Sequence, residues 1–310
     1  MTRLVLVRFP QLAALTLACA CGGDGGPTVI VPPVESSWTA MTSGTTEGLR
    51  GAWGLSATDV IAVGDGGTIL NYDGSSWTSA TSGVGVTLHH VWGAAPDDIF
   101  SVGNFGTILH FDGSAWSAMT SNTTEDLTGV WGSAADDVFA VGGSGMVLHY
   151  NGTNWSVVTS GAASELHQLW GSSASDVWAV GTSGTILHFD GSGWNLVSTG
   201  TTAVATTLWG IWGAAENDVY AVGGEGSILH YNGSTWGSMT SGTSEGLFGV
   251  WGSASNDVYA VGVSGTVLHY DGSSWNSMNS GTFTILWQVL ATPSDVFVVG
   301  SGGTILRRPT

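Results

Sequence analysis

The chain has 310 residues, of which 9% are charged, and its formal net charge at pH 7 is −18. It contains no lysine, and 5 arginines face 23 acidic residues, so it lacks the basic surface that a nucleic-acid binder needs against phosphate backbones. Hydrophobic residues make up 43% of the chain, which is enough to bury a core and excludes a disordered protein.

Residues 1–21 are predicted to be a lipoprotein-type signal peptide. Two arginines precede an apolar stretch at 12–20, which is shorter than the roughly 20 residues that a membrane span requires. Residues 15–19 and 17–21 resemble the bacterial lipobox, which makes Cys19 or Cys21 the predicted lipidation site. We therefore expect an extracytoplasmic protein, attached by this lipid to a membrane of the bacterial cell envelope. Secretion without acylation and an uncleaved N-terminus are the alternatives.

Residues 22–35 are predicted to be a linker, because glycines come first and prolines at 27, 32 and 33 then stiffen the chain. No cysteine follows Cys21. The remaining residues, 36–310, therefore contain no disulfide and no thiolate metal site.

The rest of the chain is built from seven copies of one unit. Trp-Gly pairs recur every 39 residues, with one step of 42, and a second tryptophan series keeps the same period. The first series is Trp53, Trp92, Trp131, Trp170, Trp212 and Trp251, with Leu290 in the seventh place; the second is Trp38, Trp77, Trp116, Trp155, Trp194, Trp236 and Trp275. The longer step places a three-residue insertion within residues 201–207. A period of this length is typical of β-propellers.

Each unit contains the signals of four short strands. In the fifth unit these are expected at 208–213, 218–223, 227–231 and 234–240. An Asp-Gly or Asn-Gly pair separates the third strand from the fourth, as at Asp73-Gly74, and predicts a two-residue hairpin with a type I′ turn.

The two ends of the repeat region complement each other. Residues 36–43 form a fourth strand without the preceding three, and residues 304–307 form a third strand without a fourth. We therefore predict one all-β domain over residues 36–310: a seven-bladed β-propeller with four antiparallel strands per blade, its ring closed by the N-terminal strand. It is expected to be a monomer.

The repeat Gly-Thr-Ile-Leu-His-[Tyr/Phe]-[Asp/Asn]-Gly-Ser-x-Trp, followed by Ser-Gly-Thr and then Leu-x-Gly-Val-Trp-Gly, resembles bacterial-neuraminidase-repeat-like propellers. It is most similar to the photosystem II stability/assembly factor family, over residues 36–308. The interval from Asp to Trp is one residue shorter than in the Asp box of those repeats, and no sialidase arginine triad can be mapped. The resemblance therefore implies the fold, without sialidase activity or a photosynthetic role.

Residues that repeat in every unit are interpreted as structural. The tryptophans are expected to pack between blades, the alternative being platforms for sugars. Five histidines share one position, and an aspartate precedes the second strand in all seven units, where we expect its carboxylate to accept backbone N–H bonds. The histidines are His110, His149, His188, His230 and His269; the aspartates are Asp59, Asp98, Asp137, Asp176, Asp218, Asp257 and Asp295. Because these groups are dispersed around the ring, no metal and no cofactor is expected.

Residues that differ between units are the candidate binding site. One such position directly follows the leucine that opens the first strand of each unit, and the residues on either side of it are expected to be the same in all units. This position is expected near one face of the propeller, and loops on that face carry Phe105, Glu225 and the insertion. The predicted binding residues are Arg50, His89, His167, Trp209, Phe248 and Trp287, together with Phe105 and Glu225; Thr128 completes the series of seven. Neutral drift is the alternative explanation.

The favoured function is a membrane-anchored, non-catalytic binding or scaffold module for a protein or a glycan, because variable loops on a rigid frame are where binding sites occur. A structural surface or coat lipoprotein is one alternative. A glycoside hydrolase or lyase that uses acids and histidines on the variable face is the other, and it requires a close pair of carboxylates or a His–acid pair there.

Overall fold

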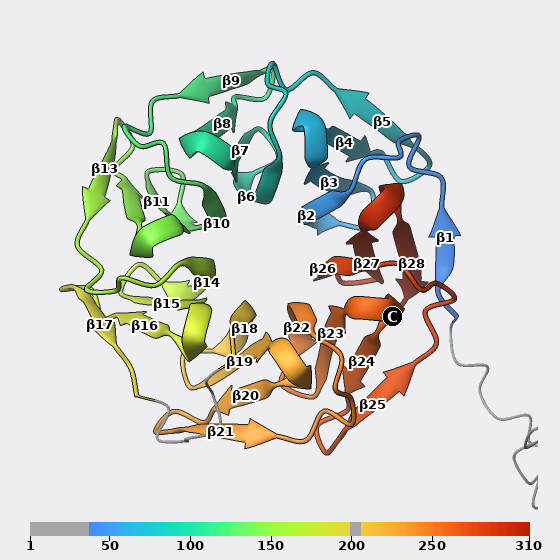
Figure 1. Cartoon of the computed structure of the whole chain (residues 1–310). Coiled ribbons are helices and arrows are strands. Elements are labelled where there is room, and N and C mark those ends of the chain that lie inside the picture. The colour runs from blue at the N-terminus through green and yellow to red at the C-terminus, as the bar shows by residue number, and fades with distance from the viewer. Residues whose placement is uncertain (1–36, 199–205) are drawn as a thin grey trace, which may run out of the picture. The chain divides into compact units, whose positions relative to one another are not determined.

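The structure is a computed structural model that describes residues 37–198 and 206–310. The described residues form seven four-stranded antiparallel sheets arranged as blades around a central channel (Figure 1). The predicted fold class, an all-β seven-bladed propeller, is confirmed. No helix within the described ranges is long and apolar enough to cross a membrane.

The strands follow the order of the chain. Blades 1 to 3 contain β2 (Leu49–Ser56), β3 (Asp59–Gly64), β4 (Ile69–Tyr72), β5 (Trp77–Ala80); β6 (Leu88–Ala95), β7 (Asp98–Gly103), β8 (Thr107–Phe111), β9 (Trp116–Met119); and β10 (Leu127–Ala134), β11 (Asp137–Gly142), β12 (Val147–Tyr150), β13 (Trp155–Val158). Blades 4 to 6 contain β14 (Leu166–Ser173), β15 (Asp176–Gly181), β16 (Ile186–Phe189), β17 (Trp194–Leu196); β18 (Leu208–Ala215), β19 (Asp218–Gly223), β20 (Ile228–Tyr231), β21 (Trp236–Met239); and β22 (Leu247–Ala254), β23 (Asp257–Gly262), β24 (Val267–Tyr270), β25 (Trp275–Met278). Blade 7 contains β26 (Leu286–Ala291), β27 (Asp295–Gly300), β28 (Ile305–Pro309) and β1 (Thr39–Met41).

A single turn of 3₁₀ helix joins the second strand to the third in every blade. These turns are η1 (Asp65–Gly67), η2 (Asn104–Gly106), η3 (Gly143–Gly145), η4 (Thr182–Gly184), η5 (Gly224–Gly226), η6 (Val263–Gly265) and η7 (Ser301–Gly303). In Figure 1 the first strand of each blade lines the channel, and the fourth strand lies at the outer rim.

The two ends of the propeller meet in blade 7. Strand β1 pairs with β28 in antiparallel register, with Thr39 opposite Arg307 and Met41 opposite Ile305. Trp38, just before β1, meets the ring of Tyr259 in blade 6 with centroids 6.4 Å apart. The ring is thus closed by the N-terminal strand, as predicted from the complementary ends.

The first tryptophan series packs between adjacent blades, and the glycine of the Trp-Gly pair explains the motif. A Cβ added to that glycine would lie 2.5–2.8 Å from the indole of the preceding blade, so only glycine leaves room for the ring. The pairs are Trp53 with Gly93, Trp92 with Gly132, Trp131 with Gly171, Trp170 with Gly213, and Trp212 with Gly252. These indoles fill the space between blades, which agrees with the packing interpretation.

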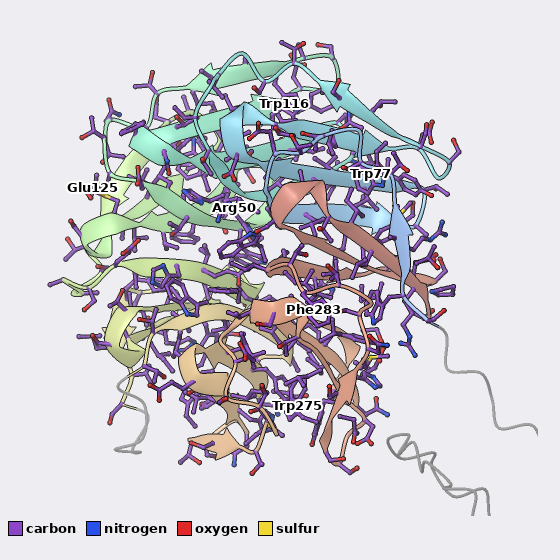
Figure 2. All side chains as sticks on the ribbon, turned by 45° about the vertical axis from the view of Figure 1, so that its right-hand side comes forward. Arg50, Trp77, Trp116, Glu125, Trp275 and Phe283 are labelled. Atoms are coloured by element: carbon purple, nitrogen blue, oxygen red, sulfur yellow. The ribbon has the colours of Figure 1, made fainter. Side chains whose placement is uncertain are left out.

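The second tryptophan series lies at the outer rim (Figure 2), and most of its members are buried. Five of these indoles make T-shaped contacts with an aromatic ring of the neighbouring blade. Six of their Nε1 groups have no hydrogen-bond acceptor in the described part of the chain. Burial and ring contacts therefore hold these residues, which agrees with the packing interpretation.

The predicted type I′ turn between the third and fourth strands is wrong. In blade 1, Gly74 has a positive φ of 91° but Asp73 does not, whereas a type I′ turn requires both. Tyr72 pairs with Trp77, so four residues form the loop, and the Asp73 carboxylate accepts the backbone N–H groups of Ser75 and Ser76. The Ser75 hydroxyl, followed by these N–H groups, lowers the pKa of Asp73 to about 2. The aspartate thus stabilises the loop through its side chain.

Candidate functional site

The seven variable residues of the first strands come together at one end of the central channel. They surround a cavity of about 250 Å³, which we call the mouth. The residues lining it are Arg50, His89, His90, Thr128, Glu165, His167, Gln168, Trp209, Phe248, Trp287 and Gln288. Figure 2 shows Arg50 near the centre of the ring, away from the rim tryptophans. Each of the seven variable residues is partly exposed.

A β-bulge in every blade orients these side chains. In blade 1, Leu49 pairs with Gly64 and Gly51 with Val63, so Arg50 has no partner residue on β3. The same register shift occurs at the equivalent residue of the other six blades. Bulges commonly redirect a side chain next to a functional site. The fold therefore presents one unpaired residue per blade to the mouth.

Four mouth residues are each held by a partner from the 3₁₀ turn of their own blade. Arg50 forms two hydrogen bonds with Asp65, at 3.0 and 3.1 Å. The other pairs are His89 with Asn104 at 2.5 Å, His167 with Thr182 at 3.3 Å, and Trp287 with Ser301 at 3.1 Å. Each partner is the first residue of its turn.

These partners change together with the mouth residues. A cation faces a carboxylate in blade 1, an imidazole faces an amide or a hydroxyl in blades 2 and 4, and an indole N–H faces a hydroxyl in blade 7. Matched pairs of this kind favour a selected arrangement over independent drift at the two positions. The mouth is therefore a preorganised surface, in which a second layer of residues fixes the first.

Aromatic residues form a continuous wall along one side of the mouth. Neighbouring ring centroids are 5.6 Å apart between Trp209 and Phe248, and 4.5 Å apart between Phe248 and Trp287. His167 contacts Trp209 at 4.4 Å, and the guanidinium of Arg50 lies 4.4 Å from the Trp287 ring. Five planar groups from consecutive blades thus contact one another around the channel.

Polar residues form the floor of the mouth, and they are not among the residues predicted from the sequence. The residue after each variable position is glycine in four blades, but it is His90, Gln168 and Gln288 in the others. The expectation that the neighbouring positions are uniform is therefore wrong. Three large polar residues that interrupt a series of glycines were the signal that could have identified this floor.

His90 and Gln168 are joined across the channel. His90 Nδ1 lies 3.2 Å from the carbonyl oxygen of Val130, which can only accept, so Nδ1 carries the proton. The Gln168 amide then donates to His90 Nε2 at 2.9 Å, while its oxygen accepts the N–H of Ile211 at 3.2 Å. This network connects residues of blades 2, 3, 4 and 5 below the mouth.

The mouth carries little unbalanced charge. Burial lowers the pKa of His90 to about 4 and that of His167 to about 4, and charge repulsion from His89 acts in the same direction. Both histidines are therefore neutral at pH 7. The charge of Arg50 is compensated by Asp65. Glu165, which is largely exposed, lies 3.9 Å from His167 Nδ1 and is the single carboxylate among the lining residues.

Two predicted binding residues lie outside the mouth. Phe105 and Glu225 are the central residues of η2 and η5, where both have positive φ angles near 57°. Phe105 is 70% exposed, and neither residue lines the cavity. Their participation in binding stays a prediction. The predicted insertion falls mostly within residues 199–205, outside the described residues.

The repeated aspartates and histidines form a separate network, one pair in each of blades 2 to 6. The histidine Nε2 lies 2.6–2.8 Å from the aspartate in all five pairs. Among the described residues no backbone N–H donates to these five carboxylates, so the prediction that they accept such bonds is wrong. Side chains two residues apart share a strand face, so Asp137 lies beside Phe139. His149 is the cross-strand partner of Phe139, which brings its imidazole within reach of the Asp137 carboxylate.

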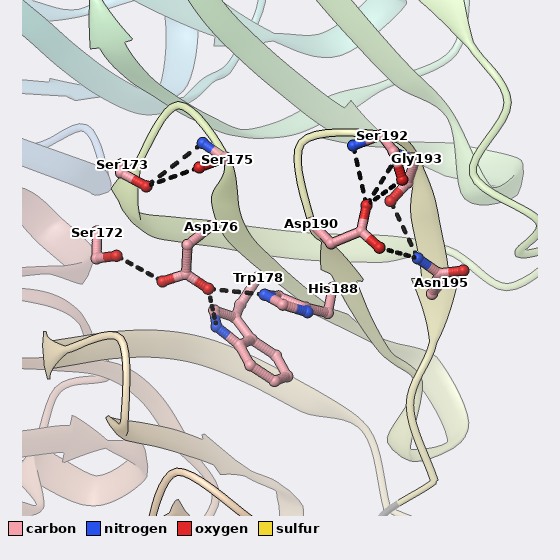
Figure 3. A network of polar contacts seen from close by, with 10 residues as sticks. All are labelled: Ser172, Ser173, Ser175, Asp176, Trp178, His188, Asp190, Ser192, Gly193 and Asn195. Atoms are coloured by element: carbon pink, nitrogen blue, oxygen red, sulfur yellow. Dashed lines mark hydrogen bonds and ion pairs between the residues drawn. The ribbon is translucent and has the colours of Figure 1, made fainter.

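This network is arranged for structure and not for nucleophilic catalysis. Figure 3 shows that Ser172, Trp178 and His188 all donate to the carboxylate of Asp176. A hydrolytic triad instead requires the hydroxyl to donate to the imidazole. The described residues contain no group of three or more His, Cys, Asp or Glu side chains arranged to hold a metal ion.

No family model matches the chain, and no curated protein matches its sequence. Solved propellers do match the fold. A structure of YCF48 bound to a D1 peptide has a TM-score of 0.73 at 18% identity and covers 91% of this chain and 100% of its own. YCF48 from Cyanidioschyzon merolae has a TM-score of 0.71 at 16% identity, covering 88% of this chain and 99% of its own. The WD40 propeller domain of Doa1 has a TM-score of 0.75 at 12% identity, covering 88% and 96%.

These likenesses show the fold. YCF48 is a photosystem II assembly factor, so its structures agree with the resemblance seen in the repeat sequence.

Proposed function

We propose that this protein is a non-catalytic binding module that takes a protein or glycan ligand at the mouth. The observation that carries the proposal is the matched second layer, in which Arg50, His89, His167 and Trp287 each have a complementary partner in their own blade. Residues that served only as packing would repeat from blade to blade, as the rim tryptophans do. The propeller of YCF48, which binds a D1 peptide, is a precedent for ligand binding on this fold.

The mouth supports the hydrolase or lyase alternative less well than it supports binding. Most glycoside hydrolases use two carboxylates that flank the scissile bond. Glu165 is the single carboxylate lining the cavity, and its His167 contact of 3.9 Å is longer than a hydrogen bond. A binding role needs neither group to transfer a proton.

Truncating both indoles of the aromatic wall, Trp209→Ala with Trp287→Ala, is expected to abolish binding. Aromatic residues at a binding hot spot each contribute about 2 kcal/mol, so the double change corresponds to a loss of about a thousandfold in affinity. Because both rings are partly exposed, the melting temperature should fall only modestly. Binding would be measured on arrays of immobilised glycans and peptides, and melting by circular dichroism.

Phe283→Ala is the matched control, because this ring is 92% exposed and does not line the mouth. It should leave both binding and melting unchanged. Retained binding in the double variant would refute the proposed site.

We further propose that the propeller is held on the outer side of a bacterial membrane by a lipid on Cys19 or Cys21. The support is the lipobox resemblance of residues 15–19 and 17–21, the charged and apolar segment before them, and the Gly/Pro-rich segment 22–35. These residues lie outside the described ranges, so the proposal rests on the sequence.

Replacing both cysteines by serine is expected to release the protein from the membrane fraction of a bacterial host. A lipid attached through sulfur cannot form on serine. Fractionation followed by immunoblotting measures the shift. Single replacements identify the acylated cysteine, and a double variant that still sediments with membranes would exclude lipid attachment at this site.

A further inference from the structure

Gln288 presents to the mouth an amide that bonds to none of the described residues. The residue is 5% exposed and lines the mouth, and within the described ranges its amide makes no hydrogen bond. Gln168, at the equivalent position of blade 4, donates to His90 and accepts from Ile211. The Gln288 amide atoms are not among the fully buried, unpaired atoms of the described residues, so they are open to the mouth. Gln288 therefore has a free donor and a free acceptor where a ligand would reach the floor.

The charge of the mouth disfavours an acidic ligand. The Arg50 guanidinium forms two hydrogen bonds with Asp65 and covers the Trp287 ring, so its positive charge is already compensated. Burial keeps His90 and His167 neutral at pH 7. The remaining charge is that of Glu165, which would repel an anion. A cation also gains little, because Glu165 is largely exposed and the Arg50 guanidinium already covers the Trp287 ring. These observations together favour an uncharged ligand group.

The size of the mouth suits one small unit of a ligand. Its volume of about 250 Å³ corresponds to roughly eight water molecules and lies below the usual range for drug-sized ligands. One six-membered ring with its substituents is of this size.

The two sides of the mouth differ in polarity. Trp209, Phe248 and Trp287 form an apolar wall in blades 5 to 7. Blades 2 to 4 instead contribute the imidazole and hydroxyl groups of His89, Thr128 and His167, each of which also bonds within the protein. A sugar ring has the same division, because its C–H groups are apolar and each hydroxyl both donates and accepts hydrogen bonds. Neutral imidazole and amide groups also do both.

We propose that the mouth binds a single uncharged hexose unit at the end of a glycan, with Gln288 as the residue that hydrogen-bonds its hydroxyls. This inference rests on the proposed function and names its ligand class. Trp209, Phe248 and Trp287 exclude water from the apolar part of the ring.

The test is titration of the purified protein with glucose, galactose, mannose and N-acetylglucosamine, followed by calorimetry and tryptophan fluorescence. At least one of these sugars is expected to bind with a dissociation constant on the order of 1 mM. Gln288→Leu should weaken this binding by about tenfold without lowering the melting temperature, because the amide makes no bond within the protein. Gln288→Gly, which places here the residue found in four blades, should also weaken binding.

Three results would overturn the inference. If Gln288→Leu lowers the melting temperature and leaves sugar binding unchanged, the amide has a structural role. If arrays reveal a peptide or an acidic glycan whose binding depends on Trp209 and Trp287 but is not displaced by the neutral sugars, the ligand class is wrong while the proposed function stands. If no ligand on either array binds in a way that depends on these tryptophans, both proposals fail.

Discussion

Deleting residues 22–43 is expected to lower the melting temperature by more than 10 °C and to reduce the cooperativity of unfolding. The deletion removes β1, its pairing with β28, and the Trp38 contact with Tyr259. Loss of a large packed aromatic residue alone costs about 3–5 kcal/mol, and for a domain of this size each kcal/mol shifts the midpoint by about 2–4 °C. Calorimetry would measure both the midpoint and the cooperativity.

The deletion also exposes the edge of β28. Its backbone groups opposite Thr39 to Met41 would then be unpaired, and such an edge favours association between molecules. Removal of 22–35 alone leaves β1 in place and serves as the control. An unchanged melting temperature after the longer deletion would show that strand closure does not stabilise the ring.

The fold could be predicted because the repeat determines the number of blades and the missing strands at the two ends. The 39-residue period is visible in the sequence without any knowledge of which residues are in contact. The hairpin was predicted incorrectly because Asp73-Gly74 was interpreted from its backbone preference, whereas the Asp73 side chain bonds Ser75 and Ser76 and stabilises a four-residue loop. A local side-chain bond competed with the backbone preference.

The candidate site was predicted in part. Variation between blades identified the residues of the mouth, since equivalent positions share one environment and a difference there needs another cause. The partners in the 3₁₀ turns were not found, because Arg50 and Asp65 are 15 residues apart and meet only through the bulge after Leu49. The floor could not be predicted from the assumption that the residue after each variable position is the same in all blades. His90 and Gln288 depart from the glycine found at this position in four blades.

Gly213→Val is expected to destabilise the protein by about 3 kcal/mol, because the space beside this glycine is already filled. A Cβ at Gly213 would lie 2.5 Å from the Trp170 indole of the preceding blade, and its φ is not in the left-handed region. The penalty is therefore steric, and overfilling a packed core costs about 1–3 kcal/mol. Urea denaturation followed by tryptophan fluorescence would measure the free energy of unfolding.

Gly237→Val provides the matched control. Gly237 also lies in a strand, β21, but a Cβ there would meet nothing within 4 Å. Valine has a high strand propensity, so this change should be neutral or slightly stabilising. A similar loss at both positions would mean that glycine is needed for its backbone and not for the indole.

A second change at Trp170 separates the two partners. Blade 7 carries Leu290 where the other six have tryptophan, and Leu290 is buried at 2% exposure, so a leucine is accommodated at this position. Trp170→Leu should therefore reduce the cost of Gly213→Val, because the smaller side chain leaves room for the added methyl groups. In a double-mutant cycle the two changes should couple by about 1 kcal/mol or more. Additive effects would show that the indole and the glycine are independent, and the Trp-Gly motif would then need an explanation other than packing between blades.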